Sequence, residues 1–256
     1  MPMTLDASIS REFDEWNKTP LGQSLVKQEG EQLEPMLRKI YGPVAVQYGA
    51  LDFSNYIQSS NAVRRFHSLG HSPQPESKPL SSCLLYSLPE SMPFDAKSVN
   101  MLILPHVLEF SPDPHQILRE SARVLVPEGH LVLLCFNPFS LWGIRKGLGT
   151  LVGKHVPSPW HGRFFRLARV KDWLSVLGFD VVQGSAVCFL PPLKSPTLRE
   201  KFGFLEKAGA RWWPMCAAVF ILVVRKREIG LTPLMPRWKK KKGIAPGLAE
   251  PVTRNG

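Results

Sequence analysis

Two side chains able to move a proton follow one apolar segment of the chain. Residues 99–104 are apolar but for one asparagine, and His106 and Glu109 come directly afterwards. An imidazole titrates near neutral pH, so His106 is a candidate general base for chemistry at the end of that segment. The alternative is a structural histidine that bonds to the backbone of its own loop.

The other histidines and the cysteines do not suggest a metal site. His67 and His71 have a spacing that suits a metal only on a helix, whereas Gly70 between them and Pro73 beyond predict a loop. The four cysteines are widely separated, with no CxxC pair: Cys83, Cys135, Cys188 and Cys216. We therefore expect no metal, buried free thiols, and a cytoplasmic, reducing location.

Alternating helices and strands must position these residues. Helices are expected after Thr19-Pro20 and Asp113-Pro114, where a capping side chain precedes a proline, and over residues 169–177. Apolar runs predict strands at 44–46, 63–69, 83–86, 99–104, 130–136, 179–189 and 215–225. The alternation implies a doubly wound α/β fold with a mostly parallel sheet. No helix of the usual length is expected between the last two strands, which can therefore run antiparallel at one edge.

The net charge of +11 comes from residues 154–173, which carry +4, and residues 225–256, which carry +7, since the rest of the chain balances. Residues 154–171 interleave basic and aromatic side chains, a pattern that can bind nucleic acid, although a solvated helix face is the alternative. Residues 229–256 are expected to form a disordered basic tail, either merely solubilising or in weak contact with nucleic acid or an anionic surface. No apolar run is long enough to span a bilayer, and the N-terminus does not resemble a secretory signal.

Residues 88–143 resemble the class I S-adenosylmethionine-dependent methyltransferases of the type 11 pattern. The family's "LPF", "hvLEh" and "L.E..RVL.PgG" segments correspond to Met92-Pro93-Phe94, to 107–110 and to 118–129. The details TPLGQ at 19–23 and FNPFSLWGIRK at 136–146 are similar to a subgroup of small bacterial methyltransferase-like proteins. The resemblance implies a seven-stranded Rossmann-like sheet with an antiparallel last strand, S-adenosylmethionine as methyl donor, and an unidentified acceptor.

In such a sheet the ligand lies beyond the carboxyl ends of the strands. The resemblance therefore places the cofactor against strand ends and their turns, at Gln47, Tyr48, Gly49, Ala50, Ser68, Leu88 and Pro105, with the acceptor beside His106. For Glu109 the resemblance favours a structural role. Asn137-Pro138-Phe139 is interpreted as a turn that caps a strand, and Trp142 as a core residue or a lining of the acceptor pocket.

The sequence departs from the family at its first turn, where a GxGxG motif is usual. Only Gly49 remains, with Leu51 and Phe53 in place of the other glycines. The family usually has an acid at the end of the first strand, a second acid after the second strand and an aspartate in the fourth strand. In this sequence Gln47 stands near the first of these positions, no acid follows the second strand, and Asn100 replaces the aspartate. Losing two charged hydrogen bonds would weaken binding by about two to four powers of ten, unless Gln47 and a Ser68 hydroxyl compensate.

These observations predict three segments and one leading function. The segments are a helical extension (1–42), a methyltransferase-like domain (43–228) and the basic tail (229–256). The leading function is methyl transfer from S-adenosylmethionine to an unidentified acceptor. The alternative is a methyltransferase-like protein that has lost catalysis and binds nucleic acid or a protein, a hypothesis that gains if Leu51 and Phe53 fill the cofactor crevice.

Overall fold

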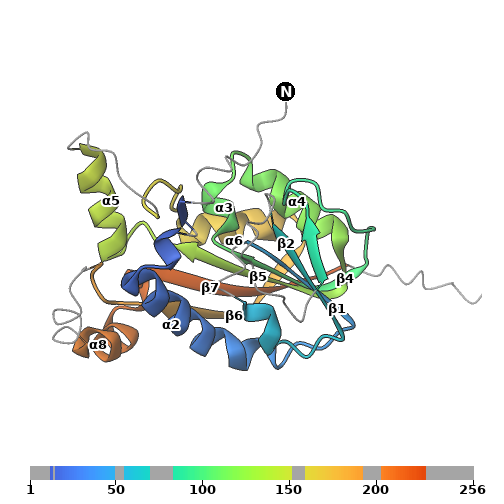
Figure 1. Ribbon diagram of the computed structural model, residues 1–256, viewed down its shortest axis with the longest axis horizontal. Helices are drawn as coiled ribbons and strands as arrows, with labels where there is room; N and C mark the ends of the chain where they lie inside the picture. Colours follow the sequence, from blue (N-terminus) through green and yellow to red (C-terminus); the bar gives the residue numbers. More distant parts are fainter. Residues whose placement is uncertain are drawn as a thin grey trace, which may run out of the picture.

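The computed structural model describes residues 12–13, 15–49, 55–69, 83–151, 159–192 and 203–228. Seven strands form one sheet in the order β3-β2-β1-β4-β5-β7-β6 (Figure 1). Their bounds are β1 Val44–Tyr48, β2 Arg64–Leu69, β3 Cys83–Tyr86, β4 Val99–Pro105, β5 Leu125–Phe136, β6 Phe179–Val187 and β7 Val219–Lys226.

The strand directions confirm the predicted fold. Strands β1 to β5 pair in parallel, and β7 lies antiparallel between β5 and β6. The order reverses between β1 and β4, whose register aligns Val46 with Leu102. In open α/β sheets the ligand crevice lies at the carboxyl ends of the strands at such a reversal.

Helices cover both faces of the sheet (Figure 1). On one face, α2 (Pro20–Leu37) buries Leu25 and Leu33 in a core shared with alternate residues of the central strands. On the other face, α4 (Pro114–Val124) and α6 (Leu167–Val176) form a second core. The remaining helical elements are η1 Tyr56–Ser59, α3 Val107–Phe110, α5 Leu141–Leu151, α8 Phe204–Trp212 and η2 Pro214–Cys216.

The helix starts are those that the capping residues predict. Thr19 accepts a hydrogen bond from the Gly22 amide, and Asp113 accepts one from the Gln116 amide. The end of the sheet formed by β6 and β7 differs from expectation. Along the chain, helix α8 follows β6 and precedes β7. The short helix η2 occupies residues that were predicted to begin the last strand.

The expectation of four buried thiols is half correct. All four cysteines are free, and Cys135 and Cys188 are buried, but Cys83 and Cys216 are exposed. Cys83 begins β3, the edge strand of the sheet, and Cys216 lies in η2 outside the sheet, so neither is covered. None of the described helices combines the length and apolarity needed to cross a membrane. The predicted basic tail lies outside the described residues.

Candidate functional site

A glycine turn marks the point at which the sheet order reverses. Gly49 directly follows β1 with φ +108°, a conformation that favours glycine, and its amide donates to the Ser68 carbonyl. A Cβ at Gly49 would lie 3.4 Å from the carbonyl oxygen of Pro105, the last residue of β4. Backbone from β1 and β4 is therefore close together at this turn. Ala50, Leu51 and Phe53, which the sequence analysis also placed here, lie outside the described residues.

The polar side chains expected to hold a cofactor make hydrogen bonds within the protein. The Gln47 side chain accepts from the Ile57 amide at 2.9 Å. The Tyr48 hydroxyl lies 2.8 Å from the Ser87 hydroxyl, which is 2.8 Å from that of Ser68. Gln47, Tyr48 and Ser68 are almost completely buried. Leu88, half-buried, follows Ser87 on the segment after β3.

Asn100, which replaces a customary aspartate of the family, does not lie at the cofactor edge. Its side-chain oxygen accepts from the Val44 amide, and a Cβ at Gly42 would collide with its side chain. Asn100 is the second residue of β4 and fastens the start of β1, so it lies at the amino ends of the strands. An aspartate here would be far from a ligand at the carboxyl ends.

His106 is buried between two carboxylates. Its Nε2 lies 2.9 Å from Glu29 of α2, and its Nδ1 lies 3.2 Å from Glu109 of α3. The same Glu109 oxygen accepts from the Phe136 amide at 2.7 Å, and the Tyr56 hydroxyl donates to Glu29. We call Glu29, His106 and Glu109 the acid–histidine cluster. It joins α2 to the carboxyl ends of β4 and β5.

The carboxylates control the protonation of His106. Burial alone would lower its pKa, but the charges and hydrogen bonds of Glu29 and Glu109 outweigh burial and raise the pKa to about 9. His106 is therefore a cation near neutral pH, and both its ring nitrogens donate to carboxylates. To act as a base, His106 would have to lose a proton and give up its hydrogen bond to one of the two carboxylates. Burial lowers the pKa of the half-buried Lys146 ammonium on α5, and the negative charge of Glu109 opposes that shift.

Aromatic side chains close over the cluster. The Phe136 ring stacks on His106 with centroids 4.2 Å apart, and Phe13 meets the same imidazole edge-on at 5.5 Å. Trp142 packs on Phe136 and on Trp16, with 1% of its surface exposed, and its indole N–H donates to the Leu190 carbonyl. Trp142 is thus a core residue, and the space beside His106 is filled.

Two acids near the carboxyl edge were not expected from the sequence. Glu29 lies on the buried stripe of α2 between Leu25 and Leu33. An acid within an apolar helical stripe could have marked it in the sequence as a buried polar residue. Glu90 follows β3, and one of its oxygens accepts from the Ser111 hydroxyl at 2.6 Å. Its other oxygen is buried and has no hydrogen-bond partner among the described residues. Such an atom is a candidate ligand contact.

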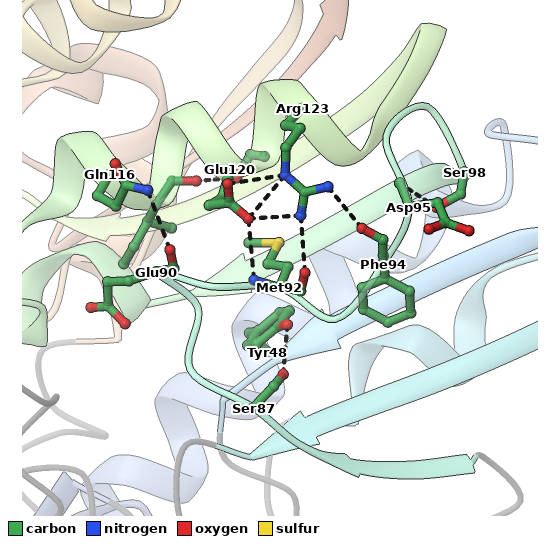
Figure 2. A network of polar contacts seen from close by, with 12 residues as sticks. Tyr48, Ser87, Glu90, Met92, Phe94, Asp95, Ser98, Gln116, Glu120 and Arg123 are labelled. Carbon is green, nitrogen blue, oxygen red and sulfur yellow. Dashed lines mark hydrogen bonds and ion pairs between the residues drawn. The ribbon is translucent and has the colours of Figure 1, made fainter.

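The family-like segment forms a clamp on the loop between β3 and β4. Figure 2 shows Arg123 of α4 donating to the carbonyls of Met92 and Phe94, at 2.9 and 2.8 Å, and pairing with Glu120. Glu120 in turn accepts from the Met92 amide. These are the residues of the "L.E..RVL" and "LPF" patterns, so those patterns report a structural fastening and not a cofactor contact.

Replacing Arg123 with lysine should lower the free energy of unfolding by about 1–2 kcal/mol, because an ammonium cannot serve three acceptors in a fixed fork. Partial exposure of the pair keeps the loss below that of a buried ion pair. Urea unfolding measures the difference. Arg119→Lys, on the same helix with an exposed 3.7 Å pair to Asp113, is the control and should change stability by less than about 0.5 kcal/mol. Equal effects of the two variants would contradict the clamp.

His67 is a second buried histidine, in β2, and it is neutral. Neither ring nitrogen has a hydrogen-bond partner among the described residues, and burial lowers the pKa to about 4. His71, whose spacing from His67 was considered for a metal pair and rejected, lies outside the described residues.

Acid should destabilise the protein through His67. Because the folded pKa lies below the unfolded value, stability is complete above about pH 6.5 and falls as pH falls toward about 4. The loss at pH 5 is about 2 kcal/mol. His67→Leu should remove this loss in urea unfolding at pH 5 and 7, whereas His115→Leu, at an exposed position on α4, should keep it. A His67→Leu protein as acid-sensitive as the parent would refute this assignment.

The basic and aromatic segment is not a free stacking surface. Trp160 and Phe165 are buried, with Arg145 over the Trp160 ring at 4.4 Å and Arg163 6.0 Å from the Phe165 centroid. Lys154 lies outside the described residues. Trp160 and Phe165 are therefore not available for base stacking, which needs accessible rings.

The Asn137-Pro138-Phe139 turn caps β5, as expected. The Asn137 amide group donates to the carbonyls of Met215 and Ala217, and its oxygen accepts from the Phe139 amide. These bonds fasten the end of β5 to the approach to β7. The side-chain amide is thus fully committed to the backbone.

Comparison with known proteins agrees with this geometry. Residues 59–133 match the family model described as a methyltransferase domain. A SAM-dependent methyltransferase from Thermotoga maritima has a TM-score of 0.61 and 14% identity, over 86% of this chain and 98% of that one. A second one, from Mesorhizobium loti, has a TM-score of 0.54 and 13% identity, over 78% and 100%. The chain has the fold of the class I S-adenosylmethionine-dependent methyltransferases.

A curated relative identifies the family more narrowly. The chain is 33% identical over 221 residues to the uncharacterized protein YafS of Escherichia coli (strain K12). The aligned region covers 86% of this chain and 83% of the relative. The chain therefore belongs to the YafS family of methyltransferase-fold proteins. The methyltransferase-domain match begins at residue 59, after β1 and Gly49, so it does not include the turn that would approach a cofactor.

Proposed function

We propose that the protein transfers a methyl group from S-adenosylmethionine to an acceptor that remains to be identified. The supporting observation is the Gly49 turn, where left-handed backbone at the end of β1 meets the end of β4 at the sheet reversal. A bound cofactor would supply the methyl group carried on its sulfonium sulfur. The chain's part is to bind and orient it, since methyl transfer mainly requires positioning.

The fit of the cofactor rests more on backbone than on carboxylates. Gln47, Tyr48 and Ser68 are engaged elsewhere, so we assign the close approach to the backbone of Gly49 and Pro105 and one wall to Leu88. The unpartnered oxygen of Glu90 is the acidic acceptor that we add to this set. Glu90→Gln should then weaken cofactor binding, whereas Glu120→Gln, in the clamp, should not.

His106 is proposed to act at this site by position and charge. Its neighbours Pro105 and Val107 both lie near Gly49, so the acid–histidine cluster sets where the two strand ends meet. A role as the general base stays open only if Glu29 or Glu109 releases the ring. Free thiols at the surface, Cys83 and Cys216, support the proposed cytoplasmic location.

Calorimetric titration with S-adenosylmethionine and with its demethylated product tests this function. We expect binding of both at about micromolar strength. No binding at millimolar ligand, with the protein shown to be folded, would overturn the proposal. It would favour the alternative, a methyltransferase-like binding module, which the engaged side chains and the late start of the family match support.

A further inference from the structure

A cavity of about 570 Å³ lies away from the Gly49 turn, between α6 and the β6–β7 end of the sheet. Its floor follows from the strand register, in which Gly184 pairs with Leu222 and Ala186 with Phe220. Two small residues thus stand where large side chains would otherwise fill the layer under α6. Leu167 and Ala168 of α6 line the opposite wall.

The lining is apolar with two cations and without an acid. Phe139, Val181 and Met215 line the cavity and are exposed, so its apolar wall continues to the surface. Arg166 and Lys171 are its charged lining residues, and neither pairs with an acidic side chain in the described part of the chain. Arg166 lies over the Phe139 ring at 5.1 Å, which holds the guanidinium beside the apolar wall.

The other polar groups of the lining are already used. The Asn137 side chain is bonded to three backbone groups, and the Ser185 hydroxyl donates to Gln32 of α2. A ligand in the cavity would therefore meet two unpaired cations and an apolar surface. Small-molecule sites of this size are typically apolar with a few polar groups that fix orientation.

We propose that this cavity binds a small amphipathic anion, an apolar chain or ring system carrying one carboxylate or similar acid group. The apolar part lies over Gly184 and Ala186, and the acid group pairs with Arg166 and Lys171. The tail at 229–256 is an unsuitable occupant, because it carries six basic residues and one acid. The assignment does not depend on methyl transfer, because neither the Gly49 turn nor the acid–histidine cluster contributes to the lining.

Decanoate is the probe, titrated by calorimetry into the full chain without S-adenosylmethionine. We expect saturable one-to-one binding, with 1-decanol about tenfold weaker or worse because it lacks the charge. Reversing both cations, Arg166→Glu with Lys171→Glu, should weaken decanoate by about tenfold or more and leave 1-decanol unchanged. The matched control is Arg169→Glu on the same helix, where Arg169 lies over Trp173 outside the cavity, and it should change neither.

Filling the floor provides a test that does not involve charge. Ala186→Leu should weaken both probes, provided that circular dichroism shows a folded protein. If this variant does not fold, the charge-reversal pair alone decides. No saturable binding of decanoate at about 1 mM would overturn the proposal. So would equal binding of 1-decanol, or decanoate binding that the reversal pair leaves unchanged, because the anion would then be recognised elsewhere.

Discussion

Replacing His106 with asparagine should lower the free energy of unfolding by about 3 kcal/mol at pH 6. The raised pKa of His106, about 9 against an ordinary 6.5, measures how strongly Glu29 and Glu109 hold the cation. Asparagine suits the position because His106 has φ +54°, a left-handed conformation that asparagine tolerates. What the variant lacks is the positive charge, and two carboxylates then face each other in the core.

The pH dependence of this loss identifies its cause. Because the folded pKa is above the unfolded one, the contribution of His106 is complete below about pH 6.5 and disappears as pH rises through about 9. The difference between parent and His106→Asn in urea unfolding should therefore shrink between pH 6 and 9.5. A difference that stays constant would indicate lost packing and would contradict the ion-pair interpretation.

A second substitution separates charge from shape. Adding Glu29→Gln to His106→Asn removes one of the two uncompensated carboxylates and should recover about 1 kcal/mol or more. Glu29→Gln alone should destabilise, because it leaves His106 with one partner and Tyr56 with a weaker acceptor. Strict additivity of the two substitutions would show that the pair does not interact.

The strands were predictable because their residues carry the information locally. Residues 99–104 and 130–136 are apolar runs bounded by polar or turn residues, and both lie within strands. The order of the strands did not follow from those runs and was not predicted. The expectation of a methyltransferase-type sheet came from the resemblance over residues 88–143, much of which the Arg123 clamp explains in structural terms.

The acid–histidine cluster was not predictable in full because its members meet only in three dimensions. Glu109 is one helical turn from His106, but Glu29 is 77 residues away on a helix against the other side of the ring. Asn100, which replaces a customary aspartate of the family, was rightly left out of the expected cofactor contacts. It lies at the start of β4, and only the end of a strand reaches the carboxyl edge.

The hydrophobic cores on the two faces of the sheet differ in how completely they are filled. On the α2 side, aromatic rings and the acid–histidine cluster fill the space beside β4 and β5. The α6 side keeps a cavity where β6 places Gly184 and Ala186 opposite Leu222 and Phe220. A reaction at the strand ends must therefore use the narrow backbone approach around Gly49, and the glycine itself becomes the most sensitive position.

Gly49→Asp should weaken the affinity for S-adenosylmethionine by about 100-fold or more, a loss of about 2.7 kcal/mol. The new side chain occupies the turn where we propose that the cofactor approaches the backbone, and its charge opposes the carboxylate of the cofactor. Calorimetric titration measures the loss.

The matched control is Gly178→Asp, because Gly178 also has positive φ, +78° against +108° for Gly49. Gly178 precedes β6 at the amino ends of the strands, so this variant bears similar backbone strain and the same new charge at the opposite edge of the sheet. If both variants fold and bind the cofactor as tightly as the parent, the cofactor does not approach Gly49. If both lose affinity equally, the cause is the strain and not the site. Loss in Gly49→Asp alone would place the cofactor at the turn where β1 meets β4.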